Sequence, residues 1–250
     1  MSRWQAVFFD LDGTMYDWRS CWKQTTRRTI AEHQGRFPAS DDQDLAAAVA
    51  TFSHYGRVLF AEFDRGRLDI YTARRLNYVL TAAAHGWDTS VQTIESFLER
   101  YNALLVATVL PRPGLGPTLR TLQEQHGLPL GVITNGLANE QHRKLSVLAV
   151  AAYFEPAAVI VSGEHGYAKP DPRIFRAALT ALCVSPAQAL YVGDSWENDV
   201  LGGLRAGLDV AWLNPDGAAR PTELPPSRGT LYEVARLEDL LALDGLVAAT

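Results

Sequence analysis

The segment that most constrains this chain is an apolar run that ends in two aspartates, residues 7–14, VFFDLDGT. Three apolar residues of high strand propensity predict a buried strand, followed by a loop that carries Asp10 and Asp12. In open α/β sheets, ligands bind at the carboxyl ends of the strands. Two acids one residue apart repel each other unless a cation shares their charge or one of them holds a proton. The segment therefore indicates a site for chemistry rather than a packing element.

Composition sets the class of protein. With 250 residues, 47% of them hydrophobic, the chain can form one large domain or a domain with a smaller one. A net charge of −5 argues against a partner with a nucleic-acid backbone. Cys21 and Cys183 are far apart in the sequence and fit a reducing cytoplasm. The amino terminus lacks a signal-peptide pattern and no apolar run could span a membrane, so we expect a cytoplasmic protein without a membrane partner.

The chain changes character at a breaker-rich junction, residues 111–117, PRPGLGP. Before it, apolar residues recur at helical spacing from about residue 18 to 108, and Thr89 with Gln92 is a candidate capping box. After it, strands and helices alternate. The predicted strands are 130–134, 158–162, 189–192 and 210–213, and the predicted helices are 117–126, 139–148, 172–183 and 197–206.

Alternating strands and helices predict a doubly wound, mainly parallel α/β sheet. The strand at residues 6–10 cannot be stable alone and must join that sheet. We therefore expect residues 1–17 and 109–250 to form an α/β core, with residues 18–108 inserted as a helical domain.

Four groups of polar residues lie at the ends of predicted strands or in loops of this core. They are Asp10-x-Asp12, Thr134-Asn135, Lys169 in a loop between Gly and Pro, and the acidic cluster from Asp194 to Asp199. Each alone is typical of a turn, a helix cap or a solvated loop. Together they supply carboxylates for a cation, a hydroxyl and amides for oxyanions, and one fixed positive charge. Hard oxygen ligands without a Cys or His cluster favour Mg²⁺ over Zn²⁺.

These four motifs, in this order and with a helical insertion, resemble the haloacid dehalogenase superfamily of phosphohydrolases. The resemblance covers essentially the whole chain. It implies a Rossmann-like core with a helical cap of the type inserted between the first two motifs. Within the superfamily, the core segments are similar to bacterial pyrimidine nucleoside 5′-monophosphatases, which favours a nucleotidase.

The resemblance also implies catalytic roles. Asp10 becomes the nucleophile that forms an aspartyl-phosphate, and Asp12 becomes the general acid and then the general base. Thr134 and Lys169 bind the oxygens of the transferred phosphoryl group, helped by main-chain N–H groups near Asn135.

A metal site is implied as well. Mg²⁺ is expected at the Asp10 carboxylate, the Asp12 carbonyl and Asp194, while Asp199 orients Lys169 or supports the metal ligands. The expected substrate is a small phosphorylated metabolite, and the expected state is a monomer or small homo-oligomer.

Several alternatives remain open at this point. A phosphomutase or phosphotransferase shares Asp12, and a non-enzymatic binding protein would have lost the nucleophile or the lysine. A 2-haloacid dehalogenase has no leaving alcohol to protonate, so Asp12 disfavours that reaction. In the cap, substrate contacts or simple helix packing could explain the aromatic residues and two arginines, namely Trp18, Trp22, Phe60, Phe63, Tyr71, Arg19 and Arg65.

Overall fold

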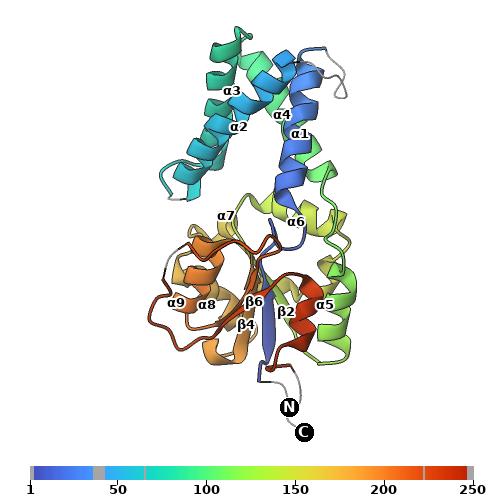
Figure 1. Ribbon diagram of the computed structural model, residues 1–250, viewed down its shortest axis with the longest axis vertical. Helices are drawn as coiled ribbons and strands as arrows, with labels where there is room; N and C mark the ends of the chain where they lie inside the picture. Colours follow the sequence, from blue (N-terminus) through green and yellow to red (C-terminus); the bar gives the residue numbers. More distant parts are fainter. Residues whose placement is uncertain (1–2, 36–42, 65, 222, 247–250) are drawn as a thin grey trace. The chain divides into compact units, whose positions relative to one another are not determined.

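The structure is a computed structural model that describes residues 3–35, 43–64, 66–221 and 223–246. The chain divides into two compact units, one formed by residues 1–17 with 110–250 and the other by Trp18–Val109. The first is an α/β unit and the second is a helical unit inserted after the first strand (Figure 1).

The α/β unit is built on a six-stranded sheet of order β3-β2-β1-β4-β5-β6, with every neighbouring pair parallel. This confirms the predicted doubly wound fold. The edge strand β6 was not predicted, because most of its side chains are partly or fully exposed and its apolar pattern is weak. The strands are β1 (Ala6–Phe9), β2 (Leu130–Thr134), β3 (Val159–Val161), β4 (Ala189–Gly193), β5 (Asp209–Leu213) and β6 (Leu231–Val234).

The order of the strands reverses around β1. Strand β2 pairs with one edge of β1 and β4 pairs with the other, so β1 lies at a topological switch point. The N–H of Asp10 continues the ladder by donating to the carbonyl of Val192 at 2.8 Å. The polar residues that follow β1, β2 and β4 are thereby brought to the same edge of the sheet.

Helices cover both faces of this sheet, with α8 and α9 on one side and α5 on the other (Figure 1). Asp171 caps α8 and Pro172 occupies its first position, where a residue without an N–H is well tolerated. The α-helices of the unit are α5 (Leu115–Glu124), α6 (Ala138–Val147), α7 (Ser162–His165), α8 (Pro172–Ala181) and α9 (Gly202–Arg205). Short 3₁₀ turns lie at Ala151–Tyr153, Pro156–Ala158, Pro186–Gln188 and Leu237–Ala242.

The helix predicted at 197–206 is in fact a π-helical turn, Trp196–Leu201, followed by α9. Its start is capped by the Ser195 side chain, which accepts from the N–H of Asn198. The Asp199 carboxylate folds back so closely that a Cβ on Gly193 would lie 2.4 Å from the Asp199 carboxyl carbon. A π turn is a common device at functional sites, and here it directs an acid toward the end of β4.

The helical unit contains α1 (Trp18–His33), α2 (Gln43–Asp64), α3 (Ile70–His85) and α4 (Val91–Ala107). Its interior is rich in aromatic rings, including Phe52, Tyr78, Phe97 and Tyr101. Helix α4 is capped by Ser90, which accepts from the N–H of Thr93, so the expected Thr89 capping box is wrong.

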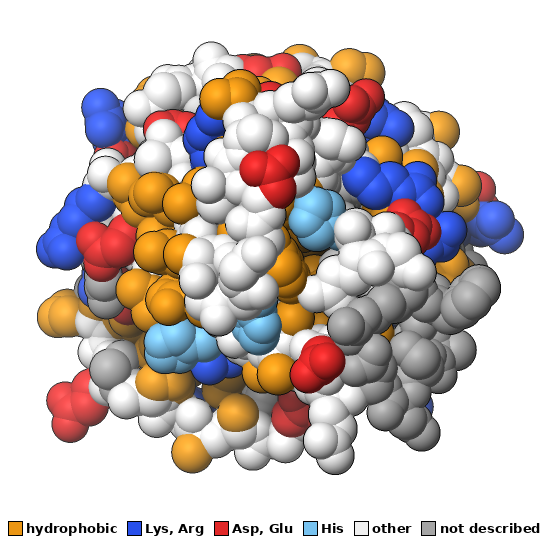
Figure 2. Space-filling model, turned by 90° about the horizontal axis from the view of Figure 1, so that it is seen from above, with side chains coloured by type: hydrophobic (Ala, Val, Ile, Leu, Met, Phe, Trp, Pro, Cys, Tyr) orange, Lys and Arg blue, Asp and Glu red, His pale blue; other side chains and the backbone are white. Residues whose placement is uncertain are grey.

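Within the described residues, no helix has both the length and the apolar character needed to cross a membrane. Figure 2 shows one face of the molecule, on which acidic and basic side chains are interspersed among hydrophobic and histidine side chains. Neither sign of charge dominates this face.

Candidate active site

The carboxyl edge of the sheet gathers the predicted site residues of the α/β unit. Asp10 directly follows β1, Thr134 ends β2, and Asp194 directly follows β4. Lys169 lies in the loop before α8, and its side chain returns to the same edge. Residues from distant parts of the sequence therefore meet at the switch point of the sheet.

Lys169 forms the centre of a buried charge cluster. Its ammonium group is 2.6 Å from Asp10 Oδ1, 2.7 Å from Asp199 Oδ1 and 2.8 Å from the Tyr191 hydroxyl. Only 3% of Lys169 is exposed. Burial opposes the charge of the ammonium group, but the carboxylates of Asp10 and Asp199 outweigh it and raise the pKa of Lys169. Lys169 is therefore a fixed cation at this site.

The acids outnumber the cation. Burial raises the pKa of Asp10 well above its usual value, although Lys169 opposes the shift. Burial, reinforced by Asp199, raises the pKa of Asp194 to about 7. Carboxylate oxygens of Asp10, Asp194 and Asp199 all lie within 4.8 Å of one another. A hard divalent cation fits this oxygen-only set, because it would stabilise the ionised form of carboxylates that burial disfavours.

The loop after β1 is shaped around Asp194. Gly13 has φ +96°, and a Cβ there would lie 2.3 Å from Asp194 Oδ2. The Thr14 hydroxyl donates to Asp10 at 3.1 Å, and the Arg112 guanidinium donates to the Gly13 carbonyl at 2.7 Å. Glycine is needed at position 13 both for its backbone angle and for the close approach of the acid.

Asp12 is held by a separate set of donors. Lys144 Nζ is 2.7 Å from Asp12 Oδ1, Gln141 Nε2 is 2.8 Å from Oδ2, and the Tyr16 hydroxyl also donates to Oδ1. Burial opposes ionisation, but Lys144 and these hydrogen bonds lower the pKa of Asp12 below its usual value. The pKa of Asp10 is thus raised and that of Asp12 is lowered, so Asp12 is the one of the two acids that its own donors hold in the ionised form.

Asp199 and Asn135 contact Lys169 in different ways. Asp199 Oδ1 accepts from the Lys169 ammonium group. The Asn135 side chain exchanges two hydrogen bonds with the Lys169 backbone, at 2.8 and 3.0 Å. This side chain therefore fixes the lysine loop, which leaves the Asn135 main-chain N–H as the group expected to meet a phosphoryl oxygen. Thr134 is buried, and its hydroxyl accepts from Gln141 at 2.7 Å.

Sequence reasoning missed the partners of these residues, notably Tyr16, Gln141, Lys144 and Tyr191. A signal for two of them was present. Within α6, the residues Gln141, Lys144 and Leu145 are buried and recur at helical spacing. Two polar residues on the buried stripe of a helix that starts beside a predicted site indicate a function for that stripe.

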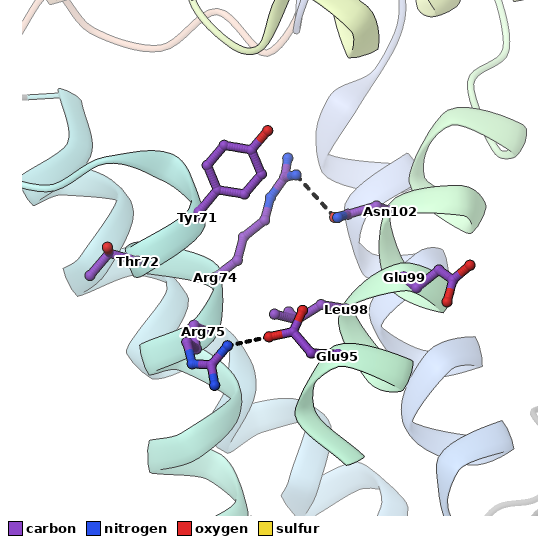
Figure 3. Close-up of a pocket in the computed structure, with 8 residues that line it drawn as sticks. All are labelled: Tyr71, Thr72, Arg74, Arg75, Glu95, Leu98, Glu99 and Asn102. Atoms are coloured by element: carbon purple, nitrogen blue, oxygen red, sulfur yellow. Dashed lines mark hydrogen bonds and ion pairs between the residues drawn. The ribbon is translucent and has the colours of Figure 1, made fainter. Parts of the chain in front are cut away.

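The helical unit has a pocket of about 430 Å³ between α3 and α4 (Figure 3). Arg74 is only 7% exposed and donates to Asn102 at 3.0 Å, and Tyr71 lines the same pocket. Arg75 forms an ion pair with Glu95 on its rim. The pocket brings a buried guanidinium, an amide and an exposed aromatic ring to one place.

The other cap residues named from the sequence have varied positions. Trp22 packs against the aromatic interior, whereas Trp18 is exposed. Phe60 and Phe63 are half-buried, and Arg19 is exposed. Arg65 lies outside the described residues.

Comparison with known proteins places the chain in a family. The haloacid dehalogenase-like hydrolase family matches residues 4–207. A glyceraldehyde 3-phosphate phosphatase of Methanopyrus kandleri is 30% identical, over 82% of this chain and 81% of its own. The pyrimidine 5′-nucleotidase YjjG of Escherichia coli is 28% identical, over 96% of this chain and 98% of its own. The chain therefore belongs to the haloacid dehalogenase-like hydrolases and is an enzyme of that family.

Solved structures agree on the fold. The magnesium-bound HAD-hydrolase YfnB from Bacillus subtilis superposes with a TM-score of 0.76 at 23% identity, covering 96% of this chain and 98% of its own. Haloacid dehalogenases are also among the solved structures of similar fold. The fold alone thus does not separate phosphate chemistry from dehalogenation, and the site must do so.

Proposed function

We propose that this chain is a Mg²⁺-dependent phosphatase of small phosphorylated metabolites that acts through an aspartyl-phosphate on Asp10. The observation that carries the proposal is the pairing of Asp10 with the buried Lys169 while Asp12, two residues on, is bound by other donors. The first acid is placed beside a fixed cation, and the second is kept apart from it. Such a division suits a nucleophile and an acid–base catalyst.

In the first step, an Asp10 oxygen attacks phosphorus and the bond from phosphorus to the leaving oxygen breaks. The electron pair of that bond goes to the leaving oxygen, which takes a proton from Asp12. Lys169 and the Thr134 hydroxyl stabilise the charge on the transferred phosphoryl oxygens. Arrival of the phosphate dianion near Asp12 raises the pKa of that carboxyl, which favours its acid form.

In the second step, the oxygen of a water molecule attacks the phosphorus of the aspartyl-phosphate, and the water gives a proton to Asp12. The bond from phosphorus to the Asp10 oxygen breaks, its electron pair stays on Asp10 as a carboxylate, and inorganic phosphate leaves. Asp10, Asp194 and the Asp12 carbonyl would hold Mg²⁺, which when bound supplies positive charge for the acids and the phosphate. Asp199 holds Lys169 in place at 2.7 Å.

Substrate choice is assigned to the helical unit. A pocket of that unit contains Arg74 and Tyr71, whose guanidinium and phenol groups are suited to bind a polar or anionic group. Relatives named as phosphatases act on glyceraldehyde 3-phosphate, pyrimidine nucleotides and N-acylneuraminate 9-phosphate. Nucleoside 5′-monophosphates and sugar phosphates are therefore the first substrates to test.

A mutase or phosphotransferase with the same site would return the phosphoryl group to a substrate. A dehalogenase has no alkoxide to protonate, so the three donors that hold Asp12 favour phosphate ester hydrolysis. Product analysis separates the first alternative, because hydrolysis accumulates inorganic phosphate whereas a mutase accumulates an isomer.

The test is phosphate release from a panel of nucleotides and sugar phosphates, with Mg²⁺ and with a chelator. Asp10→Asn is nearly isosteric and is expected to abolish release without loss of the fold, because an amide is a poor nucleophile. Asp171→Asn makes the same change at a helix cap where asparagine serves equally well, and it should keep full activity. Turnover that persists in Asp10→Asn would remove Asp10 as the nucleophile.

A further inference from the structure

Two residues of α6 fix the Asp12 carboxylate from both oxygens. Lys144 Nζ lies 2.7 Å from Oδ1 and Gln141 Nε2 lies 2.8 Å from Oδ2. They are three positions apart and share the buried face of the helix. A carboxylate bound on each oxygen is fixed in rotation as well as in position.

Burial of the Lys144 ammonium group costs free energy, so a contribution to stability does not explain why a lysine occupies this position. Lys144 is 5% exposed, while the Asp12 side chain keeps 32% of its surface open. Burying an ammonium group costs several kcal/mol, and an apolar side chain of similar volume is often equally stable there. The ion-pair partner of Lys144 is Asp12, whose side chain is much more exposed than that of the lysine. The lysine is therefore better explained by what it does to Asp12.

The loop after β2 is shaped to admit Gln141. Gly136 has φ +140°, and a Cβ there would lie 3.1 Å from the Gln141 amide. Besides Asp12, the same Nε2 lies 2.7 Å from Thr134 Oγ1 and 2.8 Å from the Asn135 carbonyl. Three oxygens around it require the amide nitrogen at that position, because the reversed amide would place a fourth oxygen among them.

We propose that Lys144 and Gln141 are positioning residues that aim Asp12 at the leaving oxygen of the substrate. The inference rests on the proposed function and extends it to residues outside the four motifs. As the phosphorus–oxygen bond breaks, its electron pair moves to the leaving oxygen, which takes the Asp12 proton. A leaving group that is stable as an anion needs no such proton. The rate of hydrolysis should therefore depend on Lys144 strongly when the leaving oxygen needs a proton, and weakly when it leaves as a stable anion.

The experiment compares p-nitrophenyl phosphate, whose leaving group departs as an anion, with β-glycerophosphate, whose leaving group is an alkoxide. Their kcat/KM values cover the steps up to the first bond cleavage, so later hydrolysis of the aspartyl-phosphate does not enter. In Lys144→Met, kcat/KM for β-glycerophosphate should fall by roughly 10- to 100-fold, part of the full effect of a general acid. For p-nitrophenyl phosphate it should fall no more than about threefold, because little proton transfer is needed.

Two further variants provide controls. Lys144→Arg keeps a cationic donor to Asp12 and should restore part of the activity toward β-glycerophosphate. Arg143→Met removes an exposed cation from the adjacent position of α6 and should leave both substrates unchanged. If Lys144→Met does not fold, Gln141→Leu removes the donor to the other oxygen. Because Gln141 also contacts Thr134, both substrates should lose activity, but β-glycerophosphate by at least about tenfold more.

An equal fall for both substrates, or no fall for either, overturns the inference, because a purely structural role does not distinguish leaving groups. Failure of the proposed function looks different. Wild-type protein that releases phosphate from neither compound, or Asp10→Asn protein that still releases it, contradicts the proposed function and with it the inference.

Discussion

The two units of this protein differ in what they bury. The α/β unit buries charge at the end of its sheet, where Asp10, Lys169 and Asp199 are all nearly inaccessible. The helical unit buries rings, such as Tyr78 and Phe97 with centroids 4.7 Å apart, and keeps many of its ion pairs at the surface. Buried charge is costly and aromatic packing is stabilising. The difference indicates that the first unit gives up stability for chemistry, whereas the interior of the second is built mainly for stability.

The largest expected effect comes from removing the buried cation. In Lys169→Met, phosphate release should fall by about 10³-fold or more, because the phosphoryl oxygens lose a fixed charge. Unfolding free energy should also fall, by about 3–5 kcal/mol, since Asp10 and Asp199 are left buried without their cation. Activity assays and urea denaturation measure the two losses.

The double variant Lys169→Met with Asp199→Asn separates these effects. It removes one uncompensated acid and should recover part of the stability while activity stays lost. Recovery of activity together with stability would mean that Lys169 acts only as a structural partner, and that the contrast between the units is mistaken.

The sequence predicted the chemistry of the α/β unit better than its geometry. Asp10 and Asp194 follow strands and Thr134 ends one. The alternation of strands and helices predicts that these strands are parallel, so the meeting of the three residues at one edge was foreseeable. The donors to Asp12 were not, because Lys144 and Gln141 lie on a helix whose rotation about its axis depends on tertiary packing. The π turn that redirects Asp199 also has no sequence signal of its own.

The sequence also failed to predict the edge strand β6 and the residue that caps α4. Strand β6 lacks a two-residue alternation because it is an edge strand with exposed side chains. At the start of α4, Asp88 accepts from the N–H and hydroxyl of Ser90, and this local network selects Ser90 over Thr89 as the cap. Several small polar residues in a row offer competing caps, and only the surrounding hydrogen bonds decide among them.

We expect an effect of intermediate size at Gly13, which can be compared with Gly86 because both glycines have a positive φ. Gly13→Ala should lower phosphate release by at least about 100-fold, because the new Cβ would lie 2.3 Å from Asp194 Oδ2 and displace that acid. Gly86, which ends α3, has a φ of +67°, and a Cβ added there would meet no atom within 4 Å. Gly86→Ala should therefore cost only about 1 kcal/mol of unfolding free energy, from backbone strain, and leave activity unchanged. Similar activities in the two variants would contradict the crowding at Gly13.

The smallest effect concerns an exposed ion pair of the helical unit, between Glu32 and Arg100. Hydrogen bonds from Arg100 lower the pKa of Glu32 to about 2, with burial opposing and Arg28 assisting. Because the pair is largely exposed, Arg100→Ala should reduce unfolding free energy by only about 0.2–1 kcal/mol at pH 7. Urea denaturation of the variant, with Arg57→Ala as an exposed arginine control, measures this loss.

The pH dependence of that small loss has a definite sign. A carboxyl whose pKa is depressed in the folded state contributes stability above its ordinary value of 4.5, and the contribution is lost as pH falls toward about 2. The difference between wild type and Arg100→Ala should therefore be constant from pH 7 to about 5 and shrink below that. It should also shrink in 1 M salt, which screens exposed charges but not the buried Lys169 cluster. A difference that stayed constant from pH 7 down to pH 2 would mean that Arg100 stabilises the helical unit by packing of its side chain rather than by its charge.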